Sequence, residues 1–85
     1  MKTIALDDFL TEGILIEKKF RQKIEKINWQ KYDNENVLIK GCSQAPIPTW
    51  AYLIIASNLS NHARKIYFGE ARRAIEIYKN YKLNQ

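Results

Sequence analysis

Two short apolar runs, separated by a longer apolar segment, constrain the fold of this chain more than any other feature. The first run, VLI at residues 37–39, follows turn residues and is closed by Gly41. Its length and β-branched content are typical of a strand that is buried on both faces. Residues 49–63 predict a helix, and KIYFG at residues 65–69 predicts a second strand. Strand, helix and strand with short connections form a β-α-β unit, so we predict a small α/β protein with a short parallel sheet.

The predicted helix is apolar on more than one of its faces. Its apolar residues include Trp50, Leu53, Ile54 and Leu59, which do not fall on a single stripe. A helix that is apolar nearly all round is buried on more than one side. Two strands alone make a poor sheet, so further strands must come either from the segment near Ile4 or from a second chain.

The two ends of the chain differ in how clearly they can be interpreted. From Glu17 onward, Phe20, Ile24 and Ile27 recur at spacings of four and three among lysines and glutamates, which predicts an amphipathic helix. The C-terminal stretch EARRAIEIYKNYK fits a helical period, but it also alternates as an edge strand would. We favour a helix for residues 70–82.

Length and composition restrict the classes of protein. A chain of 85 residues accommodates one domain, residues 1–85, with a small core. No apolar run approaches the roughly 20 residues that span a bilayer, and we expect a cytoplasmic protein without membrane contact. The net charge of +5 permits nucleic-acid binding, yet the lysines of residues 18–26 alternate with glutamates as on a solvated helix face. We therefore favour a solvated helix face over a nucleic-acid interface.

The segment KGCSQAPIPTWAY, residues 40–52, carries the candidate functional residues. In a β-α-β unit it connects the carboxyl end of a strand to a helix N-terminus, where ligands usually bind. The candidate ligand contacts are Lys40, Gly41, Cys42, Ser43, Pro48, Thr49 and Trp50. A purely structural corner, a ligand or metal contact, and a reactive thiol at Cys42 all remain open.

Catalysis by Cys42 lacks partners in the sequence. His62, the only histidine, lies at the far end of the predicted helix, roughly 20 Å from the corner at about 1.5 Å per residue. A single cysteine forms no intramolecular disulfide, and a metal site would have to be shared between chains. We assign no catalytic residue, no metal ligand and no cofactor.

The stretches VLIKGCSQAPIPTWAY, YFGE at residues 67–70 and IYK at residues 77–79 resemble the bacterial domain-of-unknown-function family numbered 2480. The upstream stretch GILIEKKFRQKIEKINWQKY is also similar to that family. The resemblance implies that members of the family are longer and carry the strand, corner, helix and strand pattern twice. This chain resembles a short version with a single copy. It further implies a link to iron-sulfur cluster assembly, with iron or an iron-sulfur cluster as a conceivable cofactor. The family's second copy has a cysteine after its glycine-glutamate pair, but here Ala71 follows Glu70.

Three functions are compatible with these observations. We favour a non-enzymatic, homodimeric binding or accessory protein, because the all-round apolar helix needs more cover than one small domain supplies. Its small ligand or protein partner is not identified. The first alternative is a thiol-dependent or metal-associated enzyme or carrier that uses Cys42. The second is weak nucleic-acid binding through basic faces.

Overall fold

A four-stranded sheet with two helices forms the protein, for which a computed structural model describes residues 1–41 and 44–82. The strands are β1 (Lys2–Ala5), β2 (Asn36–Lys40), β3 (Lys65–Phe68) and β4 (Ile75–Lys79), and they lie side by side in that order. Strands β1, β2 and β3 are parallel, and β4 is antiparallel to β3. The prediction of a small α/β protein is confirmed.

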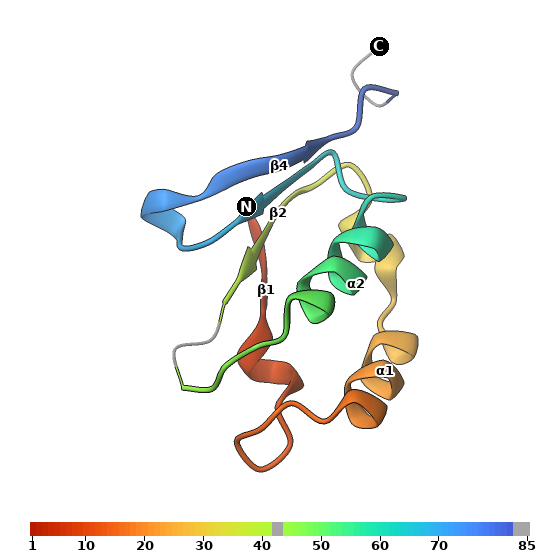
Figure 1. The fold of residues 1–85 in the computed structure, drawn as a ribbon. Helices are drawn as coiled ribbons and strands as arrows, with labels where there is room; N and C mark the ends of the chain where they lie inside the picture. The colour runs from red at the N-terminus through yellow and green to blue at the C-terminus, as the bar shows by residue number, and fades with distance from the viewer. Residues whose placement is uncertain (42–43, 83–85) are drawn as a thin grey trace.

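Both helices cover the same face of this sheet. Helix α1 (Glu17–Lys26) connects β1 to β2, and α2 (Thr49–Leu59) connects β2 to β3. Because both crossovers advance the same way along the sheet and such crossovers are right-handed, the two helices must fall on one side. Figure 1 shows them together on that side, with β4 at the sheet edge away from α1.

The core lies between the sheet and these helices. The strands alternate, so that every second side chain faces the helices, as Ile4, Val37, Ile39 and Ile66 do. Helix α2 places three fully buried side chains against them at a spacing of four residues: Ala51, Ile55 and Leu59. The aromatic side chains of Phe9, Phe20 and Trp50 continue the core toward α1, with ring centroids 5.4 and 5.7 Å apart.

Helix α2 begins at the predicted residue but ends at Leu59, earlier than the sequence pattern suggested. Its last turn is closed by side chains that bond to helix carbonyls. Asn58 Nδ2 donates to the carbonyl of Ile54 at 2.8 Å, and Ser60 Oγ donates to that of Ser57 at 2.8 Å. Such local bonds compete with helix continuation, which explains the early end.

The N-terminal segment supplies the third parallel strand. Of the two sources that the sequence left open, the segment near Ile4 forms β1 and pairs with β2, so that Ile4 stands beside Ile39. A 3-10 helix (Leu6–Phe9) follows directly and buries Leu6 and Phe9. A tight turn, with Glu12 at φ 51° and Gly13 at φ 83°, then leads the chain into α1.

The preference for a C-terminal helix is wrong. After a 3-10 helix (Ala71–Arg73), residues 75–79 form strand β4, which pairs with β3 and places Ile75 beside Phe68. Gly69, at φ 120°, reverses the chain, a conformation that few other residues adopt. A register shift near Ile66 and Tyr67 marks a bulge in this pairing. The bulge leaves Ile77 of β4 without a cross-strand partner in the register.

The fold predicts a sharp difference between two isoleucines. Ile55 is fully buried, whereas Ile14 is 58% exposed. We expect Ile55→Val to lower the free energy of unfolding by about 1 kcal/mol, because it removes one methylene from packed surroundings. Ile14→Val should change it by less than about 0.5 kcal/mol. Urea unfolding followed by circular dichroism measures both values, and equal losses would contradict the proposed core.

Candidate functional site

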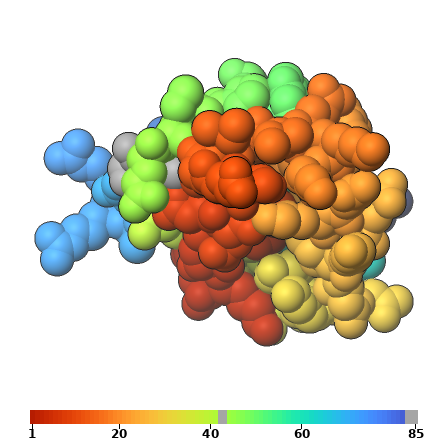
Figure 2. All heavy atoms as spheres, turned by 90° about the horizontal axis from the view of Figure 1, so that it is seen from below, coloured from red at the N-terminus to blue at the C-terminus, as the bar shows by residue number. Residues whose placement is uncertain are grey.

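A crevice opens where the parallel strands end. Its volume is about 350 Å³, and its lining comes from the residues after β1, β2 and β3 together with one side chain of α2: Asp7, Lys40, Gly41, Tyr52, Phe68, Gly69 and Glu70. We call this hollow the carboxyl-edge crevice. Figure 2 looks onto this end of the molecule and shows the segment after β3 (blue) projecting from the body. The crevice therefore lies at the edge where α/β proteins usually bind ligands.

Two aromatic rings form one wall of the crevice. Tyr52 of α2 meets Phe68 of β3 edge to face, with ring centroids 5.0 Å apart. Gly41 allows Tyr52 to lie this close to β2, because a Cβ at position 41 would stand 3.1 Å from the tyrosine hydroxyl. The glycine that closes β2 thus shapes the crevice by the absence of a side chain.

A second hollow of about 410 Å³ adjoins the crevice on the helix-free side of the sheet. We call it the side hollow; it is lined by Thr3, Leu38, Lys40, Glu70, Ala71 and Arg72. Lys40 and Glu70 line both spaces. In the described part of the chain, the ion pairs are Arg21–Glu17, His62–Asp33 and Lys65–Glu76. The charged groups around the two hollows therefore do not neutralise one another through ion pairs.

The candidate residues from the sequence divide into separate places. Lys40 and Gly41 line the crevice, whereas Cys42 and Ser43 lie outside the described residues. Pro48 precedes α2, and its carbonyl accepts from the amide of Ala51 at 3.0 Å. Thr49 lies on a different, apolar surface described below.

Trp50 is held in the helix layer and contributes nothing to the crevice lining. Its ring meets Phe20 nearly perpendicularly, and the Arg21 guanidinium carbon lies 6.0 Å from the ring centroid. Contacts with two residues of α1 make Trp50 a packing residue between the helices. Sequence reasoning missed Asp7, Tyr52 and Glu70, whereas Arg72 was weighed as an anion contact and a solvated helix start was favoured. The signal for Glu70 and Arg72 was their place just after the second strand candidate.

His62 lies at the opposite end of the sheet from the corner. Its Nδ1 is 2.6 Å from Asp33 Oδ1, and its carbonyl accepts from the amide of Asn34 at 3.0 Å. These contacts hold the start of β3 against the loop before β2. The expected separation of His62 from the corner follows from its place after the C-terminal end of α2.

An apolar trough runs beside the crevice between α2 and the sheet. Its volume is about 370 Å³, and its lining residues carry no charge: Ile39, Thr49, Tyr52, Leu53, Ala56, Phe68 and Ile77. Tyr52 and Phe68 also line the crevice, so their ring pair is the wall between the two spaces. Leu53 is 63% exposed and Ile77 50% exposed. The trough exists because no described helix covers β4 at Ile77.

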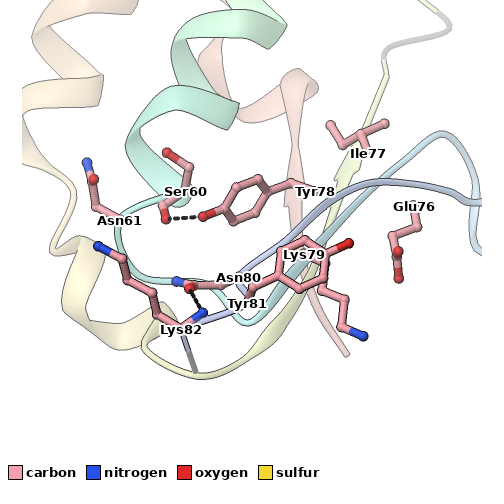
Figure 3. A pocket seen from close by; sticks show the side chains of 9 residues that line it. All are labelled: Ser60, Asn61, Glu76, Ile77, Tyr78, Lys79, Asn80, Tyr81 and Lys82. Carbon is pink, nitrogen blue, oxygen red and sulfur yellow. Dashed lines mark hydrogen bonds between the residues drawn. The ribbon is translucent and has the colours of Figure 1, made fainter. Parts of the chain in front are cut away.

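Another hollow, about 770 Å³, lies at the other end of β4, where Figure 3 shows its lining. Tyr78 reaches from β4 toward the end of α2, where its hydroxyl donates to the carbonyl of Ser60 at 3.1 Å. Lys79 places its ammonium 5.5 Å from the ring centroid of Tyr81. The tyrosine bond anchors β4 to α2, so this surface has a structural explanation.

Fold and crevice together define a small α/β protein with a crevice at the carboxyl ends of its parallel strands. A family model described as "Protein of unknown function (DUF2480)" matches residues 1–85, and the chain belongs to this family. The resemblance inferred from the corner and the second strand is thereby confirmed. Comparison with curated proteins and with solved structures gave no match.

The described part of the chain has neither a cluster of metal-ligand side chains nor a membrane-spanning helix. Within residues 1–41 and 44–82, no three His, Cys, Asp or Glu side chains gather so that they could hold a metal ion. None of the helices in these residues has the length and hydropathy needed to cross a bilayer.

The contact between Gly41 and Tyr52 makes a prediction that a double-mutant cycle measures. Gly41→Ala should lower the free energy of unfolding by about 1 kcal/mol, because the new methyl group crowds the tyrosine hydroxyl. In a Tyr52→Phe background the hydroxyl that the methyl group would crowd is absent. The alanine still restricts the unfolded chain more than glycine does, which favours the folded state. There the same change should be neutral or stabilising by up to about 1 kcal/mol. An equal cost in both backgrounds would show that the hydroxyl does not limit position 41.

Proposed function

We propose that this protein is a homodimeric binding protein in which two copies pack over their apolar troughs and each offers its carboxyl-edge crevice to a small ligand. The observation that carries the proposal is the trough itself. It places exposed Leu53 and Ile77 on one uncharged surface of a chain with a net charge of +5. Two such copies repel at long range, but they can meet here without bringing like charges together.

The shape of this surface suits a second copy. A two-fold interface uses the same patch on both partners, so the patch needs a protrusion and a hollow side by side. Leu53 protrudes from α2 at the rim of the trough, and the trough lies directly next to it. In a two-fold arrangement each Leu53 can enter the trough of the other copy. The doubled pattern implied by the family resemblance points the same way.

The energy gained indicates how tight such a dimer is. Leu53, Ile75 and Ile77 are 63%, 65% and 50% exposed. With about 1.5–3 kcal/mol for full burial of such a side chain, covering them in both copies contributes roughly 5–11 kcal/mol. Association costs about 4–15 kcal/mol, so the most favourable balance leaves about 7 kcal/mol, which corresponds to a dissociation constant of roughly 10 μM.

The crevice is the proposed ligand site because of its position and its shared wall with the trough. A second copy over the trough would cover one side of the Tyr52–Phe68 pair, and the crevice lies on the other side. The expected link to iron-sulfur cluster assembly stays a prediction. The thiol alternative depends on Cys42, which follows crevice residue Gly41 in sequence.

Sedimentation equilibrium of the purified chain over about 1–100 μM tests the dimer. We expect a reversible monomer-dimer equilibrium. Leu53→Lys should raise its dissociation constant about 100-fold, because in a two-fold interface the lost burial counts twice. Since Leu53 is mostly exposed, the thermal unfolding of the isolated chain should change little.

Ile14→Lys is the matched control. Ile14 is 58% exposed, close to the value for Leu53, but it lies in the turn before α1 and does not line the trough. Its substitution should leave the dissociation constant within about twofold. A wild-type monomer across the whole range would exclude the dimer, and equal weakening by both substitutions would exclude the trough as its interface.

A further inference from the structure

The charges around the two adjoining hollows are arranged by sign. The carboxyl-edge crevice is lined by two carboxylates, Asp7 and Glu70, and one ammonium, Lys40. The side hollow is lined by two cations, Lys40 and Arg72, and one carboxylate, Glu70. The crevice therefore favours a positive group and the side hollow a negative one, and they meet at the Lys40–Glu70 boundary.

We propose that the two hollows together bind a small amino acid, with its amine in the carboxyl-edge crevice and its carboxylate in the side hollow. This inference rests on the proposed ligand edge and names the class of its ligand. Tyr52 and Phe68 line the crevice, and an ammonium group that packs over a ring face is attracted to it. Arg72 can hold a carboxylate through two parallel N–H donors.

The arrangement disfavours simpler ligands. A lone carboxylate or phosphate that reaches the crevice meets Asp7 and Glu70, whereas a lone amine leaves Lys40 and Arg72 without an anion. A dipolar molecule satisfies both groups at once. The hollows, about 350 and 410 Å³, fall in the size range of small-molecule sites.

The local backbone supports a site that small molecules can approach. Gly41 and Gly69 end two neighbouring strands, and both line the crevice. The amide of Gly69 donates to the carbonyl of Ile39 at 3.1 Å, which fixes the end of β3 beside β2. Main chain rather than mobile side chains thus forms part of the lining, and the amides of both glycines are reporters for a ligand.

Nuclear magnetic resonance of the ¹⁵N-labelled full chain tests this inference. The twenty α-amino acids and 5-aminopentanoate are titrated one at a time, with pentylamine and pentanoate as probes that carry only one of the two charges. We expect at least one amino acid to shift the Gly41 and Gly69 amide signals with a dissociation constant below about 1 mM. Both single-charge probes should bind at least tenfold more weakly.

Matched variants separate the site from general charge effects. Glu70→Gln and Arg72→Gln should each weaken binding at least tenfold. Glu35→Gln and Arg73→Gln, at exposed residues that line neither hollow, should change it by less than twofold. No binding by any amino acid, binding of pentanoate or pentylamine as tightly as the best amino acid, or equal weakening by all four variants would overturn the proposal.

Sedimentation of the same samples keeps the two proposals distinguishable. A dimer that binds no amino acid would overturn the ligand assignment and leave the trough interface supported. A monomer that binds an amino acid in the expected way would support the ligand assignment and overturn the dimer.

Discussion

Helix α2 packs against the sheet, against helix α1 and against Phe68 of β3, and these contacts determine most of this structure. Its fully buried line of Ala51, Ile55 and Leu59 lies on the sheet. Trp50 turns toward Phe20 of α1, and Tyr52 turns toward Phe68 of β3. A single helix thereby joins the sheet, the other helix and the crevice wall. Its remaining apolar side, at Leu53, has no described partner, and this is the origin of the trough.

The topology explains why that side stays open. Three parallel strands require two crossovers, and each crossover brings one helix to the same face. The fourth strand arrives through residues 69–74, which contain only a short 3-10 helix and bring no α-helix onto the sheet. Four strands are thus covered by two helices within residues 1–41 and 44–82. Tyr78 of β4 reaches the end of α2, but β4 remains uncovered at Ile77. Ile75 and Ile77 of β4 are apolar and exposed, and the proposed dimer would bury such side chains.

The sequence predicted those helices and strands whose own residues show a clear apolar pattern. The β2-α2-β3 unit and α1 follow from apolar runs and helical spacing, and both were predicted from the sequence. Strand β1 was left open because a four-residue edge strand has too few positions to show alternation. The C-terminal strand was mistaken for a helix because its pairing with β3 depends on the distant partners Phe68 and Ile66.

The candidate site could likewise be predicted only in part, because some of its residues are brought together by contacts between distant segments. The corner directed attention to Lys40 and Gly41, which line the crevice, but it also suggested Trp50, whose contacts lie in the helix layer. Position along the chain cannot show which way a helix-start side chain turns; only the packing of α1 decides that. Asp7 was missed because the strand before it was not assigned, so its approach to the ends of β2 and β3 could not be foreseen.

The proposed dimer, in which a second copy covers the trough, would account together for the exposed Ile77 of β4, the apolar helix α2 and the crevice wall. Isotope-filtered nuclear Overhauser spectroscopy on a mixture of ¹³C-labelled and unlabelled chains detects methyl contacts between copies only. The account predicts contacts from Leu53 and Ile77 methyl groups of one copy to Tyr52 or Phe68 rings of the other. Contacts between copies that involve other surfaces and omit Leu53 and Ile77 would contradict it.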